Sequence, residues 1–320
     1  MDFRVIGVGE VLWDLLRTGP QLGGAPANFA YHVHALGAQA QVVTRVGKDD
    51  YGREIIRRFH QLGLPDAAIQ LDETAPTGTA KVELSGGGLA HFTIQEDVAW
   101  DYIAATDEAL ATARLTDAIC FGSLAQRSET SHRAILQLVG AAPAGALRVF
   151  DVNLRQRFYT RDGIEKSLRL ANVLKLNDDE LPTLAAMFNL TGSIENQIER
   201  LGKMFDLRVV ALTRGANGSL LYQRLEEREG SSAGGARSRR GGEESGQTRW
   251  SDCPSRPVKV VDTVGAGDSF TAALVLGLLC QMDLDEINEI ANEVARYVCS
   301  QPGATPRLPL EFTARFSAST

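Results

Sequence analysis

The sequence predicts an α/β fold built on a mostly parallel sheet. Apolar strand-like runs alternate with helical segments over most of the chain, a pattern typical of β-α-β units with right-handed crossovers. The alternation breaks between Thr77 and Trp100, where two strand-like runs follow one another without a helix. Together, these observations predict a large α/β domain that carries a separate small sheet.

Composition and charge narrow the class of protein. The chain has 320 residues, of which 44% are hydrophobic and 23% charged, as in globular proteins of one or two domains. Its net charge of −7 disfavours nucleic acid and anionic membranes as partners, so backbone amides, a few arginines or a metal must hold any anionic ligand. The longest apolar run, Ala272 to Cys280, is too short to cross a bilayer. Without a secretory signal, a zinc motif or a disulfide framework, we expect a cytoplasmic protein.

The first third of the chain starts with strand signals. Apolar β-rich runs and helical periodicity predict strands at residues 3–8, 11–16, 41–46 and 68–71, and helices at 25–36 and 51–62. Two further runs, 79–84 and 91–95, flank a glycine-rich turn and predict a hairpin. Because two strands alone are marginally stable, the hairpin is expected to join residues 11–16 in a small sheet. This sheet suggests a lid made from about 11–22 and 77–100.

The alternation then resumes to the end of the chain. Strands are expected at 118–121, 148–152, 173–176, 208–213, 219–222 and 258–261, and helices at 129–139, 163–170, 178–188, 194–205, 266–281 and 285–299. Residues 226–251 are rich in Gly, Ser, Arg and Glu and nearly free of apolar side chains. Such a segment cannot bury enough surface to offset its ordering entropy, so we expect a disordered insertion between two strands.

The strongest motif occupies residues 260–270, with the sequence VVDTVGAGDSF, where a β-rich run meets a long apolar helix. Amides at a helix start form an anion site, and the small residues Gly265, Ala266 and Gly267 let the backbone approach a phosphate closely. No lysine follows, so the run is not the phosphate-binding loop GxxxxGK[ST]. The alternative is an ordinary strand-to-helix turn in which Asp268 caps the helix.

Asp268 favours the anion-site interpretation. A carboxylate inside an anion-binding turn repels the anion unless it has a chemical role. As a general base, Asp268 could accept the proton of a hydroxyl that attacks a phosphate, and the helix dipole favours its ionised form. A weak base can suffice, because phosphoryl transfer depends mainly on positioning and charge stabilisation.

Two motifs together resemble those of the PfkB/ribokinase family of carbohydrate kinases. Residues 262–270 (DTVGAGDSF) resemble the C-terminal motif of that family, and residues 23–28 (GGAPAN) resemble the N-terminal motif in its fructokinase form. The resemblance implies a three-layer α/β/α ribokinase-like core with a mostly parallel central sheet and a small β-sheet lid over residues 1–320. It also implies ATP-dependent transfer of a phosphoryl group to a sugar hydroxyl. The 226–251 insertion departs from the family pattern.

The resemblance implies three sugar-binding residues near the N-terminus. The backbone of Gly24 would contact the sugar, Asn28 would bond a hydroxyl, and Asp14 would accept bonds from hydroxyls. A carboxylate suits a vicinal diol because it accepts two bonds. The structural alternatives are a plain loop at Gly23-Gly24, a cap-region role for Asn28 and an exposed charge at Asp14.

Residues 151–155 (DVNLR) end a predicted strand, where ligands bind in open α/β sheets, and resemble the family DxNxR element. Arg155 would steady phosphate or acceptor oxygens and Asn153 would touch the sugar; a surface ion pair is the alternative for Arg155. Residues 177–180 (NDDE) resemble the NxxE element, which implies a role for Asn177 at the nucleotide phosphates and for Glu180 in holding Mg²⁺ through water. Asn177 and Glu180 also fit a helix capping box, and both readings can hold together.

The resemblance places the nucleotide along the C-terminal half. Residues 213–218 (TRGANG) resemble the nucleotide loop, with Thr213, Gly215 and Gly218 as candidate ATP contacts; Asn217-Gly218 is also a strong hairpin-turn signal. Asn292, on the last predicted helix, would border the adenine. Asp262 and Val264 would supply part of a monovalent-cation site, so K⁺ joins ATP and Mg²⁺ among the cofactors considered.

Fructose is the first acceptor that the resemblance implies, through residues 23–28. The alternatives are 2-keto-3-deoxygluconate or another small sugar, a riboside, and a catalytically silent sugar-binding protein on the same fold. The expected partners are the sugar and ATP, without nucleic acid or membrane, and a homodimer formed through the lid is also considered.

Overall fold

The computed structural model describes residues 1–16, 19–84, 90–225 and 248–317. Within these ranges, a nine-stranded sheet has the order β13-β12-β11-β10-β9-β8-β1-β4-β5. Its strands are β1 (Arg4–Val8), β4 (Gln39–Gly47), β5 (Ile69–Asp72), β8 (Ala118–Phe121), β9 (Leu147–Asp151), β10 (Val173–Asn177), β11 (Val209–Thr213), β12 (Ser219–Arg224) and β13 (Thr248–Cys253). The strands from β11 to β5 are parallel, and β12 and β13 add antiparallel pairs at one end.

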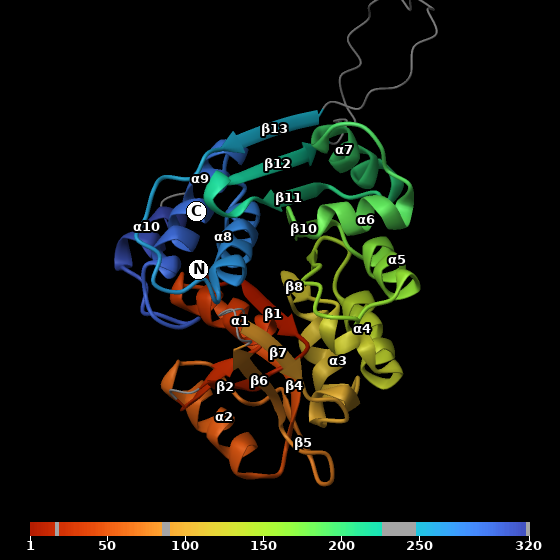
Figure 1. Cartoon of the computed structure of the whole chain (residues 1–320), viewed down its shortest axis with the longest axis vertical. Helices are drawn as coiled ribbons and strands as arrows, with labels where there is room; N and C mark the ends of the chain where they lie inside the picture. Colours follow the sequence, from red (N-terminus) through yellow and green to blue (C-terminus); the bar gives the residue numbers. More distant parts are fainter. Residues whose placement is uncertain (17–18, 85–89, 226–247, 318–320) are drawn as a thin grey trace, which may run out of the picture.

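Helices cover both faces of this sheet (Figure 1). Buried side chains of α1 (Ala25–Ala35), α2 (Asp50–Gln61), α8 (Ala266–Leu279), α9 (Leu284–Cys299) and α10 (Leu310–Ser317) form one core cluster. Those of α3 (Asp107–Arg114), α4 (Glu129–Ala141), α5 (Arg161–Leu170), α6 (Leu181–Phe188) and α7 (Ile194–Met204) form the other. The predicted three-layer α/β/α core with a mostly parallel sheet is thereby confirmed.

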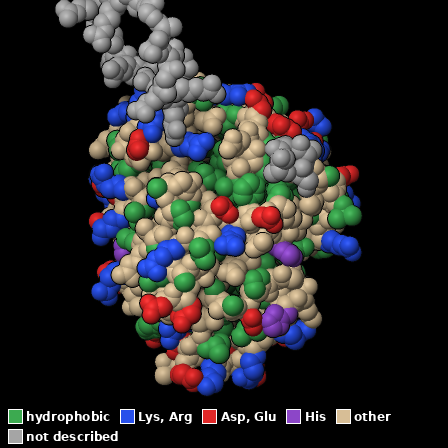
Figure 2. Space-filling view, turned by 180° about the vertical axis from the view of Figure 1, so that it is seen from behind, with side chains coloured by type: hydrophobic (Ala, Val, Ile, Leu, Met, Phe, Trp, Pro, Cys, Tyr) green, Lys and Arg blue, Asp and Glu red, His purple; other side chains and the backbone are tan. Residues whose placement is uncertain are grey.

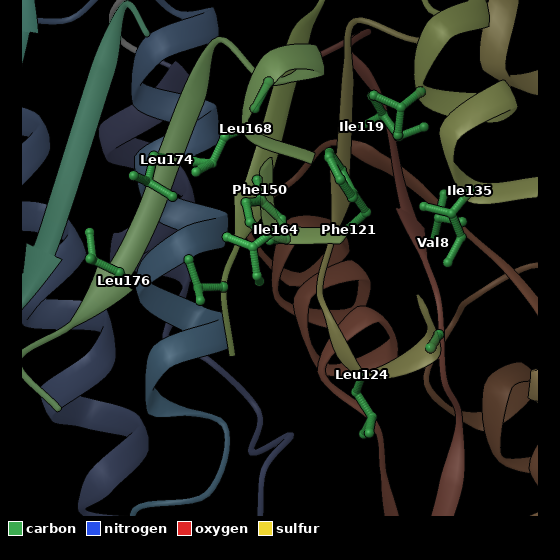
Figure 3. Close-up of a cluster of buried hydrophobic side chains, with 14 of the residues drawn as sticks. Val8, Ile119, Phe121, Leu124, Ile135, Phe150, Ile164, Leu168, Leu174 and Leu176 are labelled. Atoms are coloured by element: carbon green, nitrogen blue, oxygen red, sulfur yellow. The ribbon is translucent and has the colours of Figure 1, made fainter. Parts of the chain in front are cut away.

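The central strands are apolar on both faces because each face is covered. Successive side chains of a strand point to opposite sides, so Val149 joins one core cluster while Phe150 joins the other. Figure 3 shows Phe150 and Phe121 among the buried side chains between the sheet and the helices. Their rings stack with centroids 5.2 Å apart. This packing fixes the positions from which the strand ends project their polar residues.

A second, four-stranded sheet has the order β3-β2-β6-β7 within the described part of the chain. It consists of β2 (Leu12–Leu16), β3 (Gly19–Gly23), β6 (Gly78–Leu84) and β7 (Ala90–Ile94). The predicted hairpin therefore pairs with residues 12–16 as expected, through the parallel β2–β6 contact. The turn predicted at residues 85–88 lies outside the described residues. Strand β3 was not predicted.

Three predicted segments need correction. Residues 258–261 form no strand: Val260 and Val261 are exposed, and the Val261 amide donates to the Cys299 carbonyl at the end of α9 rather than to a neighbouring strand. The edge strand is instead β13, which takes up 248–251 of the segment expected to be disordered. The remainder of that segment, 226–247, lies outside the described residues.

Helix α6 begins at Leu181 rather than at 178, because the Asn177 side chain accepts from two following amides in a turn. Helices α3 and α10 were not predicted.

The surface matches the mixed composition. On the face shown in Figure 2, acidic and basic side chains are interspersed and no single large basic area gathers. No helix among the described residues has the length and apolar character needed to cross a bilayer.

Candidate active site

The glycine turn of residues 265–267 begins α8 in a conformation that needs glycine. Gly265 is the N-cap residue with φ of 80°, and a Cβ built on it would lie 2.4 Å from the Ala304 carbonyl oxygen. The first amides of a helix have no partner within the helix. The Ala266 amide donates to the Thr263 carbonyl at 3.4 Å, whereas the amides of Gly267 and Asp268 have no main-chain acceptor within the described structure. The turn therefore offers main-chain donors to an anion.

Asp268 lies in the first turn of α8 and meets the N-terminal motif. The Asn28 Nδ2 donates to Asp268 Oδ2 at 2.8 Å, which joins α1 to α8. Burial and the Asp151 carboxylate raise the pKa of Asp268 to about 6, although the Asn28 bond, Lys175 and Arg155 favour the ionised form. A base with this pKa is ionised at neutral pH and still takes up a proton readily.

Gly24 and Asp14 are also expected at the sugar, and the Gly24 carbonyl accepts from the Asn28 amide at 3.1 Å. Asn28 is buried, and its Oδ1 has no hydrogen-bond partner within the described structure. Gly24 has φ of 111°, and a Cβ there would lie 2.4 Å from the Glu10 carbonyl oxygen. Asp14, on β2, is half-buried, and burial raises its pKa to about 6 against the effect of Arg155. The exposed-charge alternative for Asp14 is therefore wrong.

Arg155 links these carboxylates electrostatically. Its positive charge lowers the pKa of Glu10, Asp14 and Asp268. The side chain is exposed, and no carboxylate of the described residues pairs with it within 4.0 Å. Asn153, two residues earlier, has a left-handed backbone with φ of 42° and a half-buried side chain.

Asn177 and Glu180 form the capping arrangement. Asn177 Oδ1 accepts from the Glu180 amide at 2.8 Å, and Glu180 Oε2 accepts from the Asn177 amide at 2.9 Å. Glu180 is buried, and its Oε1 accepts from the Leu154 amide at 2.9 Å. The pair thus ties the DVNLR loop to the start of α6. In the described part of the chain, no group of three or more His, Cys, Asp or Glu residues is placed to hold a metal ion.

The other expected nucleotide residues lie on β11, on the turn that follows it and on α9, and Thr213 pairs with Asn177 of the neighbouring strand. Thr213 ends β11, and Gly215 and Gly218 belong to the turn that joins β11 to β12, so the hairpin-turn interpretation is correct. A Cβ on Gly218 would lie 2.0 Å from the Cys253 carbonyl oxygen, which explains the glycine. Asn292 donates to Ser219 Oγ at 2.6 Å and to the Asn288 carbonyl at 2.8 Å, so its amide group joins α9 to β12.

Asp262 and Val264 lie in the loop before α8. Asp262 Oδ1 accepts from the Val264 amide at 3.0 Å and Oδ2 accepts from the Gly303 amide at 3.1 Å. The carboxylate therefore fixes this loop against residues 300–304, which also support Gly265. The side chain of Val264 is exposed.

Two charged residues of the site were missed by the sequence analysis. Glu10 is 2% exposed, with an Oε2 that has no partner among the described residues, and burial, reinforced by Asp268, raises its pKa to about 7. Lys175 is also buried, and its Nζ lies 3.1 Å from Asp151 Oδ1. Glu10 follows the apolar strand β1, and Lys175 interrupts the apolar strand β10. A charged residue in or beside a buried strand is unusual, and this was the signal that could have indicated both residues.

A turn of free amides beside a buried carboxylate, at the carboxyl end of a parallel sheet, fits a phosphotransferase that acts on a hydroxyl. The sequence profile of the pfkB family carbohydrate kinases matches residues 14–311. The chain therefore belongs to the pfkB family of carbohydrate kinases, enzymes that transfer a phosphoryl group to a sugar hydroxyl.

Relatives match this chain over nearly its whole length. It is 28% identical over 307 residues to a fructokinase of Klebsiella pneumoniae, covering 92% of this chain and 91% of that protein. An uncharacterized sugar kinase from Pyrococcus horikoshii, solved in complex with ATP, is 25% identical and covers 98% and 99% of the two chains with a TM-score of 0.77. A fructokinase double mutant from Vibrio cholerae, solved with fructose, ADP and potassium, is 21% identical, with a TM-score of 0.75 and coverage of 99% and 98%.

Proposed function

We propose that this kinase phosphorylates fructose with ATP, and that Asp268 is its general base. The contact between Asn28 and Asp268 carries the proposal, because it joins the sugar-binding motif to the glycine turn. The likeness to named fructokinases over more than nine tenths of the chain supports fructose as the acceptor.

In this mechanism the sugar lies against Asp14, Gly24, Asn28 and Asn153. The unpartnered Asn28 Oδ1 accepts a hydrogen bond from a sugar hydroxyl. Asp268 takes the proton of the attacking hydroxyl as the bond from the sugar oxygen to the γ-phosphorus forms, while the bond from that phosphorus to the bridging oxygen breaks and ADP leaves. The amides of residues 265–268 and the Arg155 guanidinium stabilise the charge on the transferring group.

ATP extends from the glycine turn along the C-terminal half, toward Asn177, Thr213, Gly215, Gly218 and Asn292. The free amides at the start of α8 fit its terminal phosphates. Mg²⁺, when bound, neutralises phosphate charge, and Glu180 would hold it through water because its own oxygens already accept backbone bonds. Asp262 and Val264 would contribute to a K⁺ site. A homodimer formed through the small sheet stays a prediction, as does the closing of that sheet over the sugar.

A coupled ADP-release assay over a panel of sugars tests the proposed acceptor. We expect fructose to give the highest kcat/KM, above 2-keto-3-deoxygluconate and adenosine. A clear preference for either of those would contradict fructose while leaving the kinase class intact. Binding of sugar without turnover of any acceptor would instead support a catalytically silent protein.

A further inference from the structure

A buried ammonium group lies beneath the glycine turn. Lys175 belongs to β10, and its side chain is only 8% exposed. A Cβ built on Gly267 would lie 3.1 Å from Lys175 Nζ, so the missing side chain at 267 lets the ammonium approach the backbone of the turn. A phosphate-binding loop of the GxxxxGK[ST] type carries its lysine next to the turn in sequence. Here a distant strand brings a lysine to the turn from below.

The surroundings of Lys175 keep it charged. Burial alone lowers the pKa of Lys175. The charges of three carboxylates, Asp151 from β9, Glu180 from the start of α6 and Asp268 from α8, outweigh burial, and the pKa is raised. The ammonium is therefore charged at neutral pH.

The hydrogen bond to Asp151 leaves other donors of the Lys175 ammonium without an acceptor. Lys175 makes one hydrogen bond within the described structure, to Asp151 Oδ1 at 3.1 Å, although an ammonium has three donors. The other oxygen of Asp151 accepts from the Thr271 hydroxyl at 3.0 Å, on α8. A cation with unused donors, placed against Gly267, adds positive potential where the turn amides converge.

We propose that Lys175 is a positioning residue for phosphoryl transfer, whose charge acts through the Gly267 backbone and the Asp268 carboxylate on the transferring group. The inference rests on the proposed function of the turn. The competing account is that Lys175 only neutralises Asp151 so that both can be buried. A counterion is dispensable once Asp151 is neutral, whereas a charge that serves transfer is not.

A double-mutant comparison separates the two accounts. Lys175→Met alone leaves Asp151 buried without its partner and is expected to lower stability. Lys175→Met/Asp151→Asn removes both charges, and we expect it to recover thermal stability to that of Asp151→Asn. The expected kcat of the double variant is on the order of 100-fold below that of Asp151→Asn, with the KM for the sugar unchanged. Lys166→Met, on the exposed face of α5, is the matched control and should leave kcat unchanged.

Equal kcat values for Asp151→Asn and the double variant, with stability recovered, would overturn the proposal. If the double variant does not fold, the same comparison is made with Lys175→Gln, which keeps a donor without the charge. Binding of an ATP analogue without sugar gives a readout that needs no turnover: affinity should fall about tenfold on removal of the lysine, and equal affinity would count against it. Wild-type inactivity toward every sugar would refute the proposed function, whereas the binding ratio addresses Lys175 alone.

Discussion

The Asn28 amide and the Asp268 carboxylate lie 2.8 Å apart although 240 residues of chain separate them. Burial and the Asp151 carboxylate raise the pKa of Asp268, while Asn28, Lys175 and Arg155 favour its ionised form. Specific neighbours, rather than exposure to water, thus keep the Asp268 carboxylate charged at neutral pH. This charge and the contact with Asn28 are what its proposed role as general base requires.

Asp268→Asn should reduce kcat by at least 1,000-fold, at the upper end of what a positioned base and its charge contribute. The amide keeps the shape of the side chain, so dissociation constants for sugar and ATP should stay within a few-fold of the wild type. Steady-state kinetics and calorimetry measure these quantities, and Asp107→Asn at the exposed start of α3 serves as control. Turnover near the wild-type level would remove Asp268 from the role of base.

The pH dependence of kcat tests the electrostatic surroundings of Asp268. Protonation of a base stops catalysis, so kcat should fall as pH drops through about 6. The Asp151 carboxylate is the neighbouring charge that raises the pKa of Asp268. Asp151→Asn removes that negative charge and should therefore move the midpoint to lower pH. An unmoved midpoint would show that Asp151 does not set the pKa of the group that controls kcat.

At the scale of elements, the start of α8 depends on the loop that supports it. Gly265 contacts Ala304, and His32 Nε2 lies 2.9 Å from the Ala304 carbonyl oxygen, so α1 and α8 hold the same loop. Asp262 fixes the loop from the other side through the Gly303 amide. These contacts hold the glycine turn from two sides without any ligand, which suits a site that works by preorganised donors.

Gly265→Ala should disrupt this start of α8. The new Cβ combines a left-handed φ of 80° with a distance of 2.4 Å to the Ala304 oxygen, so a loss of about 2–4 kcal/mol in the free energy of unfolding is expected, together with a large loss of kcat. Gly303→Ala is the matched control, because its φ of 75° is similar while no atom lies within 4 Å of the Cβ position. It should cost only about 1–2 kcal/mol in urea unfolding. Equal losses would show that the contact with Ala304 does not matter.

The central strands were predictable because helices cover both faces of the parallel sheet, so that the sequence of each strand is a continuous apolar run. Residues 118–121 are apolar throughout and form β8 at the predicted residues. The β-rich residues 258–261 form no strand, since intrinsic preference does not supply a neighbouring strand to pair with. Strand β3 was not predicted because Gly19 and Pro20 are unfavourable in strands. The segment is a strand because it pairs with β2.

The site was predictable where a local motif marks it. Gly24 and Gly265 show positive φ and close backbone approaches that agree with their places in glycine motifs. Lys175 and Glu10 could not be assigned in the same way, because their partners come from other strands and helices. Their importance depends on burial and on three-dimensional neighbours, which no spacing along the chain records.

The whole molecule combines a rigid core with a small sheet attached to one end. The strands of the core are fixed by two clusters of buried side chains, one on each face of the sheet. The small sheet carries Asp14, a residue of the proposed sugar site, on β2. Sugar binding should therefore stabilise that sheet more than the core.

Hydrogen exchange measures this difference. Amides of β2 and β6 should exchange more slowly when the sugar is bound, because closing the sheet reduces local opening. Strands β8 and β9, buried in the core, should show little change and provide the internal control. Uniform protection of both sheets, or none, would contradict the proposed lid.

The most direct test of the account is a crystal structure with fructose and a non-hydrolysable ATP analogue. We predict that the terminal phosphate lies against the amides of residues 265–268. A sugar hydroxyl should lie about 2.6–3.2 Å from the Asp268 carboxylate, on the side of the attack. A triphosphate bound away from this turn, or an Asp268 carboxylate remote from every sugar hydroxyl, would contradict the central claim.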